Sequence, residues 1–404
     1  MDHSRFPPLI AWLAQAGLAG RRELELLQGF CERAVPLGLP LSRAVIGVDT
    51  LHPVLEGRVF QWQREGAAAT QSEYGRYDAE SSDDKWLQSP FHRLYESGET
   101  TFRCRLSHEE PPFPILDELR RQGITDYVAM VHRFGDAGAI GTMDCTYSSW
   151  SSDRTGGFAD ADLAALEFLV PCLAVALKGA SVAGIAESLV ETYLGRDAGH
   201  RVLRGHIERG VAEKISAVLW FSDLQGFTRI TDTAPPEEII PLLNDYADAI
   251  VTALQSEGGE VLKFMGDGIL AIFDAALAAD ACACALAAAQ DAGARVAVLN
   301  KRRAAAGLPV TRFYLGLHVG EVFYGNIGST ERLDFTVVGP AVNETSRIAA
   351  MCRALDQEVL LSSAFAEAAG AGRRRLVSVG RYALRGVQRP QELYTIDPDP
   401  EARA

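Results

Sequence analysis

The chain has 404 residues, more than one ordinary hydrophobic core holds, so two domains are expected. Hydrophobic residues make up 48% and charged residues 23%, as in soluble globular proteins. The formal net charge of −14 argues against nucleic-acid binding and against a basic membrane-surface helix.

Cysteine usage and apolar runs indicate the compartment. The seven cysteines are scattered and form no Cys-x-x-Cys, which indicates free thiols in a reducing cytosol and no zinc site. The longest uncharged apolar run, residues 168–177, is about half as long as a membrane span. The first residues lack the basic-then-apolar pattern of a signal peptide. We therefore expect a cytoplasmic protein without a membrane partner.

The first half of the chain predicts helices around a sheet. Residues 1–40 have the apolar spacing of helices, and the polar residues 66–84 predict a loop. A helix is predicted at 114–123, because Pro114 suits its first turn and Gly123 its end. Strands are predicted at residues 41–49, 57–62, 101–106, 126–134 and 139–147.

A long helical pattern follows Asp160, the expected N-cap, and extends to about residue 207. We expect it to break near Pro171, Gly179, Gly184 and Gly195. The stretch is typical of a signalling linker that packs in parallel against a second chain. The alternative is a helix folded back on its own domain.

This order of elements resembles a GAF-type sensor domain over residues 35–180. The resemblance rests on helices that flank an antiparallel sheet and on the turn at residues 157–163. It implies a pocket for an unknown small-molecule ligand. The histidines of this half are dispersed, and we interpret them as surface or strand-packing residues rather than metal or haem ligands: His52, His92, His108 and His132.

The second half alternates strands and helices. Pro235 and Pro236 open a helix that Gly258 and Gly259 close. The βαββαβ order predicts an α+β domain with a ferredoxin-like sheet and helices on one face. The predicted strands are 217–223, the hairpin 260–273 and 312–319, and the predicted helices are 236–256, 275–306 and 340–352.

Two aspartates follow predicted strands of this half. Asp223 ends a buried apolar strand, and Asp267 lies in the Gly-Asp-Gly turn of a hairpin. Two carboxylates at neighbouring strand ends can hold a pair of divalent metals against a polyphosphate. The structural alternatives are a strand-end turn former for Asp223 and a hairpin-turn residue for Asp267.

Three segments, residues 221–228, 263–267 and 335–347, resemble the signature segments of class III nucleotidyl cyclases, in the family's order over residues 211–396. The resemblance implies that ATP is converted to 3′,5′-cyclic AMP and pyrophosphate with two Mg²⁺ or Mn²⁺ ions per site. It implies that Asp223, Leu224 and Asp267 bind the metals. The backbone through Phe227 and Thr228 can turn amides toward phosphate oxygens.

The purine-reading positions of similar cyclases are Lys263 and Thr336 here. A Lys donor suits adenine N1, and a Thr hydroxyl can accept from the exocyclic amine. Many members carry Asp at the Thr336 position, and the Thr form is found in a subgroup of bacterial and bicarbonate-responsive adenylyl cyclases. Guanine would require an acceptor such as Glu in place of Lys263. The structural alternative for Lys263 is a solvated charge at a strand end.

The remaining site residues follow the third segment. Asn343 and Arg347 are spaced i, i+4 and share one helical face. The resemblance implies that Asn343 positions the ribose and that Arg347 stabilises charge on the α-phosphate with its planar fork. Arg385 stands where a phosphate-contacting Lys is usual. The alternative for Asn343 and Arg347 is a surface pair.

The family's sites form between two catalytic domains, and this chain has one, so we expect a homodimer with two equivalent sites. Asp223 and Asp267 would come from one subunit and the other residues from its partner. Rival functions are a guanylyl cyclase, a degenerate nucleotide-binding or dimerisation module, and a two-metal phosphodiesterase, which would need more histidines than His318. The expected domains are a GAF-like regulatory domain (1–180), a helical linker (181–210), the catalytic domain (211–396) and a tail (397–404).

Overall fold

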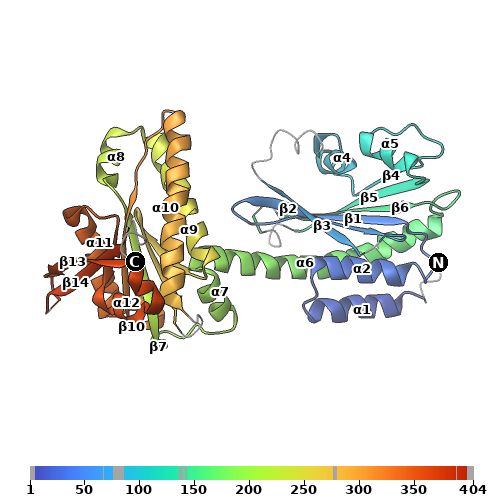
Figure 1. Ribbon diagram of the computed structural model, residues 1–404. Coiled ribbons are helices and arrows are strands. Elements are labelled where there is room, and N and C mark those ends of the chain that lie inside the picture. Colours follow the sequence, from blue (N-terminus) through green and yellow to red (C-terminus); the bar gives the residue numbers. More distant parts are fainter. Residues whose placement is uncertain are drawn as a thin grey trace. The chain divides into compact units, whose positions relative to one another are not determined.

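The computed structural model describes residues 5–66, 68–75, 86–135, 140–141, 143–275, 280–387 and 389–397. The chain divides into two compact units, Met1–Leu189 and Val190–Ala404 (Figure 1). Each unit has its own sheet and its own hydrophobic cores.

The first unit is built on a six-stranded sheet in the order β3-β2-β1-β6-β5-β4. Every neighbouring pair is antiparallel. The strands are β1 (Arg43–Asp49), β2 (Leu55–Gln63), β3 (Thr70–Gly75), β4 (Thr101–Cys104), β5 (Asp126–Arg133) and β6 (Cys145–Ser152).

Helices cover both faces of this sheet, as Figure 1 shows. One core joins the first face to α1 (Pro7–Leu18), α2 (Glu23–Ala34) and α6 (Asp160–Leu194). A second core joins the other face to α4 (Pro90–Ser97) and α5 (Pro114–Arg121). Strand β6 is buried along its whole length because it is covered on both sides.

The structure corrects several predictions for this unit. Residues 66–84 are not all loop, because β3 lies within them. The side chains of β3 are largely exposed, so this edge strand has no apolar pattern by which the sequence could predict it. Helix α4 was not predicted, and the strand predicted at 139–147 begins at Cys145. Residues 76–85 and 136–139 lie outside the described residues.

The breaks predicted near Pro171, Gly179 and Gly184 are wrong, because α6 runs unbroken from Asp160 to Leu194 with Pro171 inside it. The break predicted near Gly195 is confirmed, because α6 ends just before that residue. Asp160 is the first residue of α6 rather than its cap, and Asp162 accepts a hydrogen bond from the Ala159 amide at 2.9 Å. Each glycine costs a helix only about 1 kcal/mol, whereas each buried leucine contributes roughly 1.5–3 kcal/mol. The buried Leu166, Leu169, Leu173 and Leu177 therefore outweigh the helix breakers.

The second unit has an eight-stranded sheet in the order β13-β14-β12-β10-β7-β9-β8, with β11 paired to β10. Among its described strands, only β10 and β12 pair in parallel. The strands are β7 (Ala212–Leu224), β8 (Glu260–Met265), β9 (Gly268–Asp274), β10 (Phe313–Gly328), β11 (Leu333–Val338), β12 (Val359–Ser362), β13 (Leu376–Tyr382) and β14 (Gln391–Ile396).

Its helices pack on the sheet by their apolar faces. The largest core joins β7, β9 and β10 to α9 (Pro236–Ser256) and α10 (Ala281–Ala305) through side chains such as Trp220, Tyr246 and Phe273. The opposite face packs Leu219 and Phe335 against Ala198 of α7. The remaining helices are α7 (Arg196–Leu203), α8 (Phe227–Thr233), α11 (Pro340–Leu355), α12 (Ser363–Ala368) and the 3₁₀ helix η2 (Gly370–Arg375).

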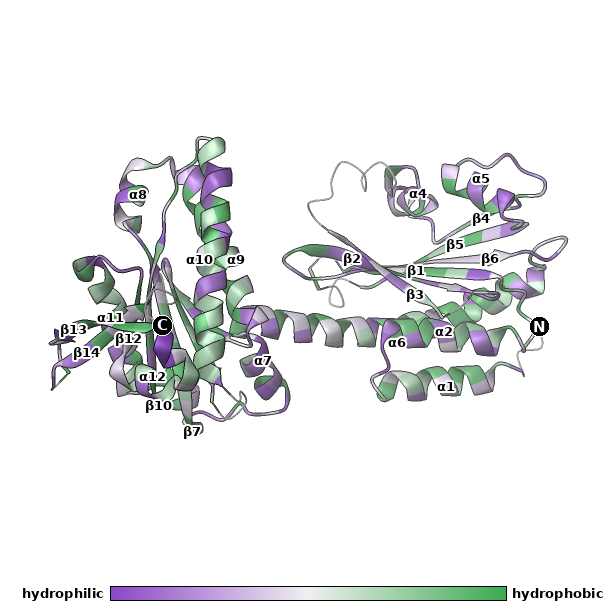
Figure 2. Cartoon of the chain, viewed as in Figure 1, coloured by the Kyte–Doolittle hydropathy of each residue, from purple (hydrophilic) through white to green (hydrophobic). Residues whose placement is uncertain are grey.

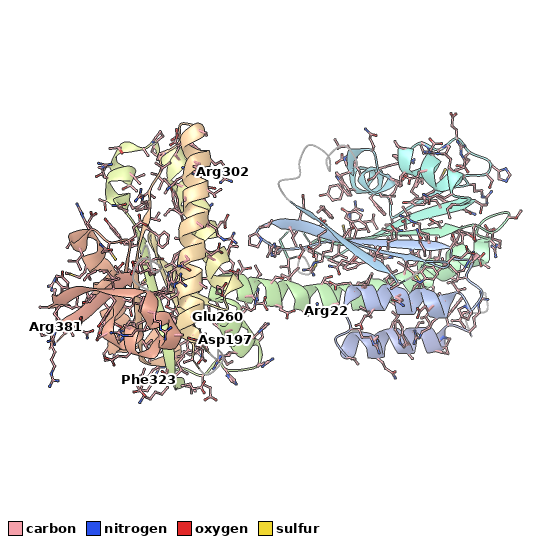
Figure 3. The ribbon with its side chains drawn as sticks, viewed as in Figure 1. Arg22, Asp197, Glu260, Arg302, Phe323 and Arg381 are labelled. Atoms are coloured by element: carbon pink, nitrogen blue, oxygen red, sulfur yellow. The ribbon has the colours of Figure 1, made fainter. Side chains whose placement is uncertain are left out.

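The predicted βαββαβ order is present as β7, α9, β8, β9, α10 and β10, and the unit is a mixed α+β fold. Strand β10 is longer than predicted because its second half still pairs with β7 and also carries β11. His318, which is close to the end of the strand predicted at 312–319, therefore lies inside β10. Helix α7 contacts β8, where the Asp197 amide donates to Glu260 at 3.5 Å; both are labelled in Figure 3.

Among the described residues, α6 and α10 are long and apolar enough to meet a length-and-composition test for membrane spans. Their apolar windows are 39% and 44% buried inside the protein, and core helices commonly pass this test. Figure 2 shows both helices with long hydrophobic stretches.

Candidate active site

The two predicted metal-binding aspartates lie side by side. Asp223 is the penultimate residue of β7, between β9 and β10 at the centre of the sheet. Asp267 lies in the turn between β8 and β9, where Gly266 has a φ of 68° that favours glycine. Ser222 pairs with Ile269, so the turn faces the end of β7, and the Leu224 amide donates to Asp267 Oδ2 at 3.3 Å.

The carboxylate of Asp223 ionises less readily than an ordinary aspartate. Burial, and then the hydrogen bond and negative charge of Asp267, raise the pKa of Asp223 to about 7. Asp223 therefore keeps its proton to a higher pH than an ordinary aspartate does, unless a cation compensates the second charge. Two hard oxygen donors with excess negative charge fit Mg²⁺ or Mn²⁺, and the Leu224 backbone lies beside them.

A cleft of about 1060 Å³ opens at this pair. It is lined by Asp223, Leu224, Asp267, Phe227 and Thr228, so the structure brings these five predicted residues together. Gly226, with a φ of 69°, turns the chain from β7 into α8, which begins at Phe227. The first amides of a helix lack intrahelical partners and suit an anion.

Three arginines in the same cleft were not predicted: Arg229, Arg312 and Arg353. Arg312 also donates to Glu358 at 2.7 Å, and its neighbour Tyr314 accepts from Gln225 at 2.9 Å. Tyr314 pairs with Asp223 across β10 and β7. The Gln225 backbone amide donates to Arg312 O at 2.8 Å, which holds Arg312 beside the end of β7. Such pairing between distant strands is not visible in the sequence.

The predicted base-reading residues lie on β8 and β11. Lys263 Nζ forms an ion pair with Asp334 Oδ2, and Asp334 was not among the predicted site residues. Asp334 and Thr336 are two residues apart on β11, so they share one side of the strand. Thr336 is buried, whereas Lys263 is partly exposed. The structure therefore brings Lys263 to the strand that carries Thr336.

Asn343 and Arg347 lie four residues apart on α11. The Arg347 guanidinium packs on the turn that follows Arg385: a Cβ on Gly386 would lie 3.3 Å from Arg347 Nη2. Gly386 has a φ of 73°, so the turn favours glycine for its backbone as well as its space. Arg347 and the Arg385 turn are thus neighbours.

Within one chain the predicted site falls into two groups. The residues that line the cleft at Asp223 do not include the second group: Lys263, Thr336, Asn343, Arg347 and Arg385. His318, the histidine weighed for a hydrolytic site, bonds Ser362 at 2.9 Å and lies 3.7 Å from Glu344, and burial lowers its pKa.

The second unit is similar in sequence to known nucleotide cyclases. Residues 211–398 match the family described as adenylate and guanylate cyclase catalytic domain. Adenylate cyclase 1 of Rhizobium meliloti (strain 1021) is 32% identical over 165 residues, 40% of this chain and 24% of that protein. Adenylate cyclase of Anabaena cylindrica is 34% identical over 161 residues, 39% of this chain and 31% of that protein. The crystal structure of the guanylyl cyclase Cya2 is 30% identical, with a TM-score of 0.41, over 46% of this chain and 93% of that chain.

Residues 211–398 are therefore a class III adenylyl/guanylyl cyclase catalytic domain, as the signature segments predicted. The chain spans 24% and 31% of the lengths of these two curated relatives. The Lys/Thr subgroup and the GAF-like first unit stay predictions.

Proposed function

We propose that the chain is a homodimeric adenylyl cyclase that converts ATP to 3′,5′-cyclic AMP and pyrophosphate, using two Mg²⁺ or Mn²⁺ ions per site. The observation that carries the proposal is the Asp223–Asp267 pair at a large cleft, inside a domain that matches the cyclase family. Lys263 and Thr336 favour adenine over guanine, since an ammonium donates to adenine N1.

Each residue then has a distinct task. Asp223 and Asp267 would hold the metals, which when bound would supply acidification of the ribose 3′-hydroxyl and neutralisation of the triphosphate charge. The first amides of α8, which follow Gly226, line the cleft and would contact the phosphates. The Arg312 side chain lines the same cleft and would do the same. Asn343 orients the ribose. Arg347, held against the Gly386 turn, stabilises charge that develops on the α-phosphate.

The division of the residues into two groups supports a shared site. The cleft at Asp223 has the proposed metal ligands and phosphate-binding groups. Among the described residues that line it, neither of the proposed base-reading residues of the same chain is present. A partner in head-to-tail packing would add its Lys263, Thr336, Asn343, Arg347 and Arg385. Two such sites arise in one symmetric dimer.

The direct test is cyclic nucleotide formation by the purified full chain, with ATP and GTP offered separately and with Mg²⁺ or Mn²⁺. Cyclic AMP should form from ATP faster than cyclic GMP forms from GTP. Faster GTP turnover would support the guanylyl cyclase alternative. No product from either nucleotide with either metal would leave only a degenerate binding or dimerisation module.

Complementation tests the shared site. Asp223→Ala and Asn343→Ala proteins should each be inactive. Mixed in equal amounts, about half of the dimers are mixed and each holds one intact site of two, so about a quarter of the unmodified activity should return. Mixed dimers that stay inactive would contradict a site built from two chains.

We further propose that the first unit is a GAF-like domain that binds a small molecule and regulates the cyclase in the cytoplasm. Supporting this, two buried polar atoms on neighbouring strands, His132 Nδ1 and Thr146 Oγ1, have no hydrogen-bond partner among the described residues. Native mass spectrometry of the purified chain should detect a bound small molecule, and removing it should change the cyclase rate. Bicarbonate stimulation, suggested by Thr336, would appear as a higher rate at fixed pH.

A further inference from the structure

Helix α6 is apolar on two opposite faces. One face enters the core of the first unit through Leu166, Leu169, Leu173 and Leu177. The other face carries a row of six residues, which we call the outer seam: Cys172, Val175, Gly179, Val182, Ala186 and Leu189. At 100° per residue the seam lies on the side of the helix opposite the buried leucines. Two apolar faces explain why the helix meets a membrane-span test.

The rest of the first unit leaves the middle of this seam open. Val175 is 74% exposed, and Gly179 and Ala186 are exposed as well. Cys172, Val182 and Leu189 are partly buried and pack against the core of the first unit, so they leave only part of their surface free. Contacts from the neighbouring helices lie beside the seam.

Those side contacts fix the helix without covering the seam. In α1, a Cβ on Gly17 would lie 3.5 Å from the Ala176 Cβ. From α2, Glu23 accepts a hydrogen bond from Ser181 at 3.0 Å. Arg22, labelled in Figure 3, lies 4.0 Å from Glu187. None of these α6 residues belongs to the seam.

The seam has the spacing of a coiled coil. Its residues follow steps of three, four, three, four and three, which places Cys172, Gly179 and Ala186 at a positions and Val175, Val182 and Leu189 at d positions. Phe168 and Tyr193 continue the same spacing at either end. We propose that the outer seam packs against the outer seam of a second copy of this chain, in parallel and in register.

A second copy fits better than another partner for three reasons. Identical heptad seams are self-complementary about a twofold axis. The seam carries no charge that would repel its copy, and the flanking Lys178 is drawn to the Phe134 ring at 4.4 Å. Small residues at the a positions also let the two backbones approach closely.

The direction rests on the proposed function. Each α6 leads into a catalytic domain, and two such domains must meet to share a site, so both helices should leave the seam at the same end. A parallel register places the two Cys172 residues opposite each other. Facing Cα atoms then lie roughly 4–6 Å apart for helices at ordinary spacing, which a disulfide can span.

Cysteine cross-linking of the purified full chain tests the seam. Mild oxidation should give a covalent dimer on a non-reducing gel. Cys172→Ser should abolish it. Cys284→Ser, which removes the other partly exposed thiol, should leave it unchanged. A dimer that persists without Cys172, or no dimer at all, would overturn the parallel seam.

A charge substitution tests the packing itself. Val175→Glu places two carboxylates in one d layer and should weaken dimerisation, measured by sedimentation, at least about tenfold, or about 1.4 kcal/mol. Val298→Glu is the matched control, because Val298 is a 67% exposed valine on α10. Equal dimerisation of both variants would overturn the proposal. So would flotation of the unmodified chain with lipid vesicles that Val175→Glu abolishes, since a membrane would then cover the seam.

These measurements need no nucleotide and no catalysis. A chain without cyclase activity that still cross-links through Cys172 would reject the proposed function and keep the seam. An active cyclase whose Cys172 never cross-links would reject the outer seam as a dimer contact and keep the proposed function.

Discussion

The two units place helices against sheets in similar ways, yet Asp126 of the first and Asp223 of the second have opposite electrostatic surroundings. In the first unit, the fully buried Asp126 accepts hydrogen bonds from Arg103 at 3.2 and 2.6 Å and from the Phe158 amide at 2.9 Å. In the second, Asp223 has another carboxylate for a neighbour, at an open cleft. A satisfied carboxylate holds a fold together, whereas two unneutralised carboxylates leave a site that a cation completes.

The largest effect should come from removing a cleft carboxylate. Asp223→Ala should lower cyclic AMP formation about 10⁴-fold, or about 5.5 kcal/mol, because metal binding and charge neutralisation fail together. The rate is measured with saturating ATP and Mg²⁺, and folding is checked by circular dichroism. Asp291→Asn on α10 removes an exposed carboxylate that pairs with Arg295, and it should leave the rate unchanged. A folded Asp223→Ala enzyme with near-normal turnover would contradict the metal assignment.

The corresponding change in the first unit should affect stability instead. Asp126→Ala strands the Arg103 guanidinium and the Phe158 amide, so unfolding of this unit should become easier by about 3–5 kcal/mol. Denaturant unfolding followed by fluorescence measures this. Asp117→Asn breaks an exposed i, i+3 pair with Arg120 and should cost under about 1 kcal/mol. Similar losses for the two variants would show that Asp126 has no special role.

The sequence predicted the order of elements in the second unit, and the two aspartates that meet at its cleft, better than it predicted which strands pair. Asp223 and Asp267 stand out because each interrupts an apolar strand at a glycine-rich turn, and such local signals survive in a single sequence. The helix predicted at 236–256 is α9 itself. Asp334 and Arg312 were missed because their roles depend on which strands pair, and pairing over long sequence separation leaves no periodic pattern.

In the first unit the failures follow the same logic. Strand β3 was missed because an exposed edge strand needs no apolar alternation, and Tyr74 secures it through a 2.7 Å hydrogen bond to Asp49. The breaks predicted in α6 failed because tertiary burial outweighs local propensity. Of the residues that predicted those breaks, Gly179 lies on the outer seam instead.

Base selectivity should shift by a smaller amount. Lys263→Glu exchanges a donor for an acceptor and should lower kcat/KM for ATP about a hundredfold relative to GTP, or about 2.7 kcal/mol. Because the introduced carboxylate would also face Asp334, the double variant with Asp334→Asn separates selectivity from repulsion. Lys214→Glu makes the same charge change at an exposed pair with Glu321 and should leave the ratio unchanged. An unaltered ratio in Lys263→Glu would remove Lys263 from base recognition.

The smallest effect concerns pH and Mg²⁺ in the protein without nucleotide. The pKa of Asp223 is raised to about 7 in the folded chain, against ~3.9 when unfolded. Its contribution to stability is therefore full below pH ~4 and is lost as pH rises through about 7. Mg²⁺ offsets the charge repulsion that appears above that pH. The rise in Tm on adding Mg²⁺ should be about 2–4 °C larger at pH 8 than at pH 6.

Asp267→Asn decides whether the carboxylate pair causes this dependence. Without the second carboxylate, the pKa of Asp223 should fall, although burial still holds it above its ordinary value, and the difference in the Mg²⁺ effect between the two pH values should shrink. The measurement is differential scanning fluorimetry across pH, with NaCl at matched ionic strength as the control for screening. If Mg²⁺ raises Tm equally at pH 6 and pH 8 in the unmodified chain, then the pKa of Asp223 is not raised by its surroundings, and the contrast with the neutralised Asp126 loses its physical basis.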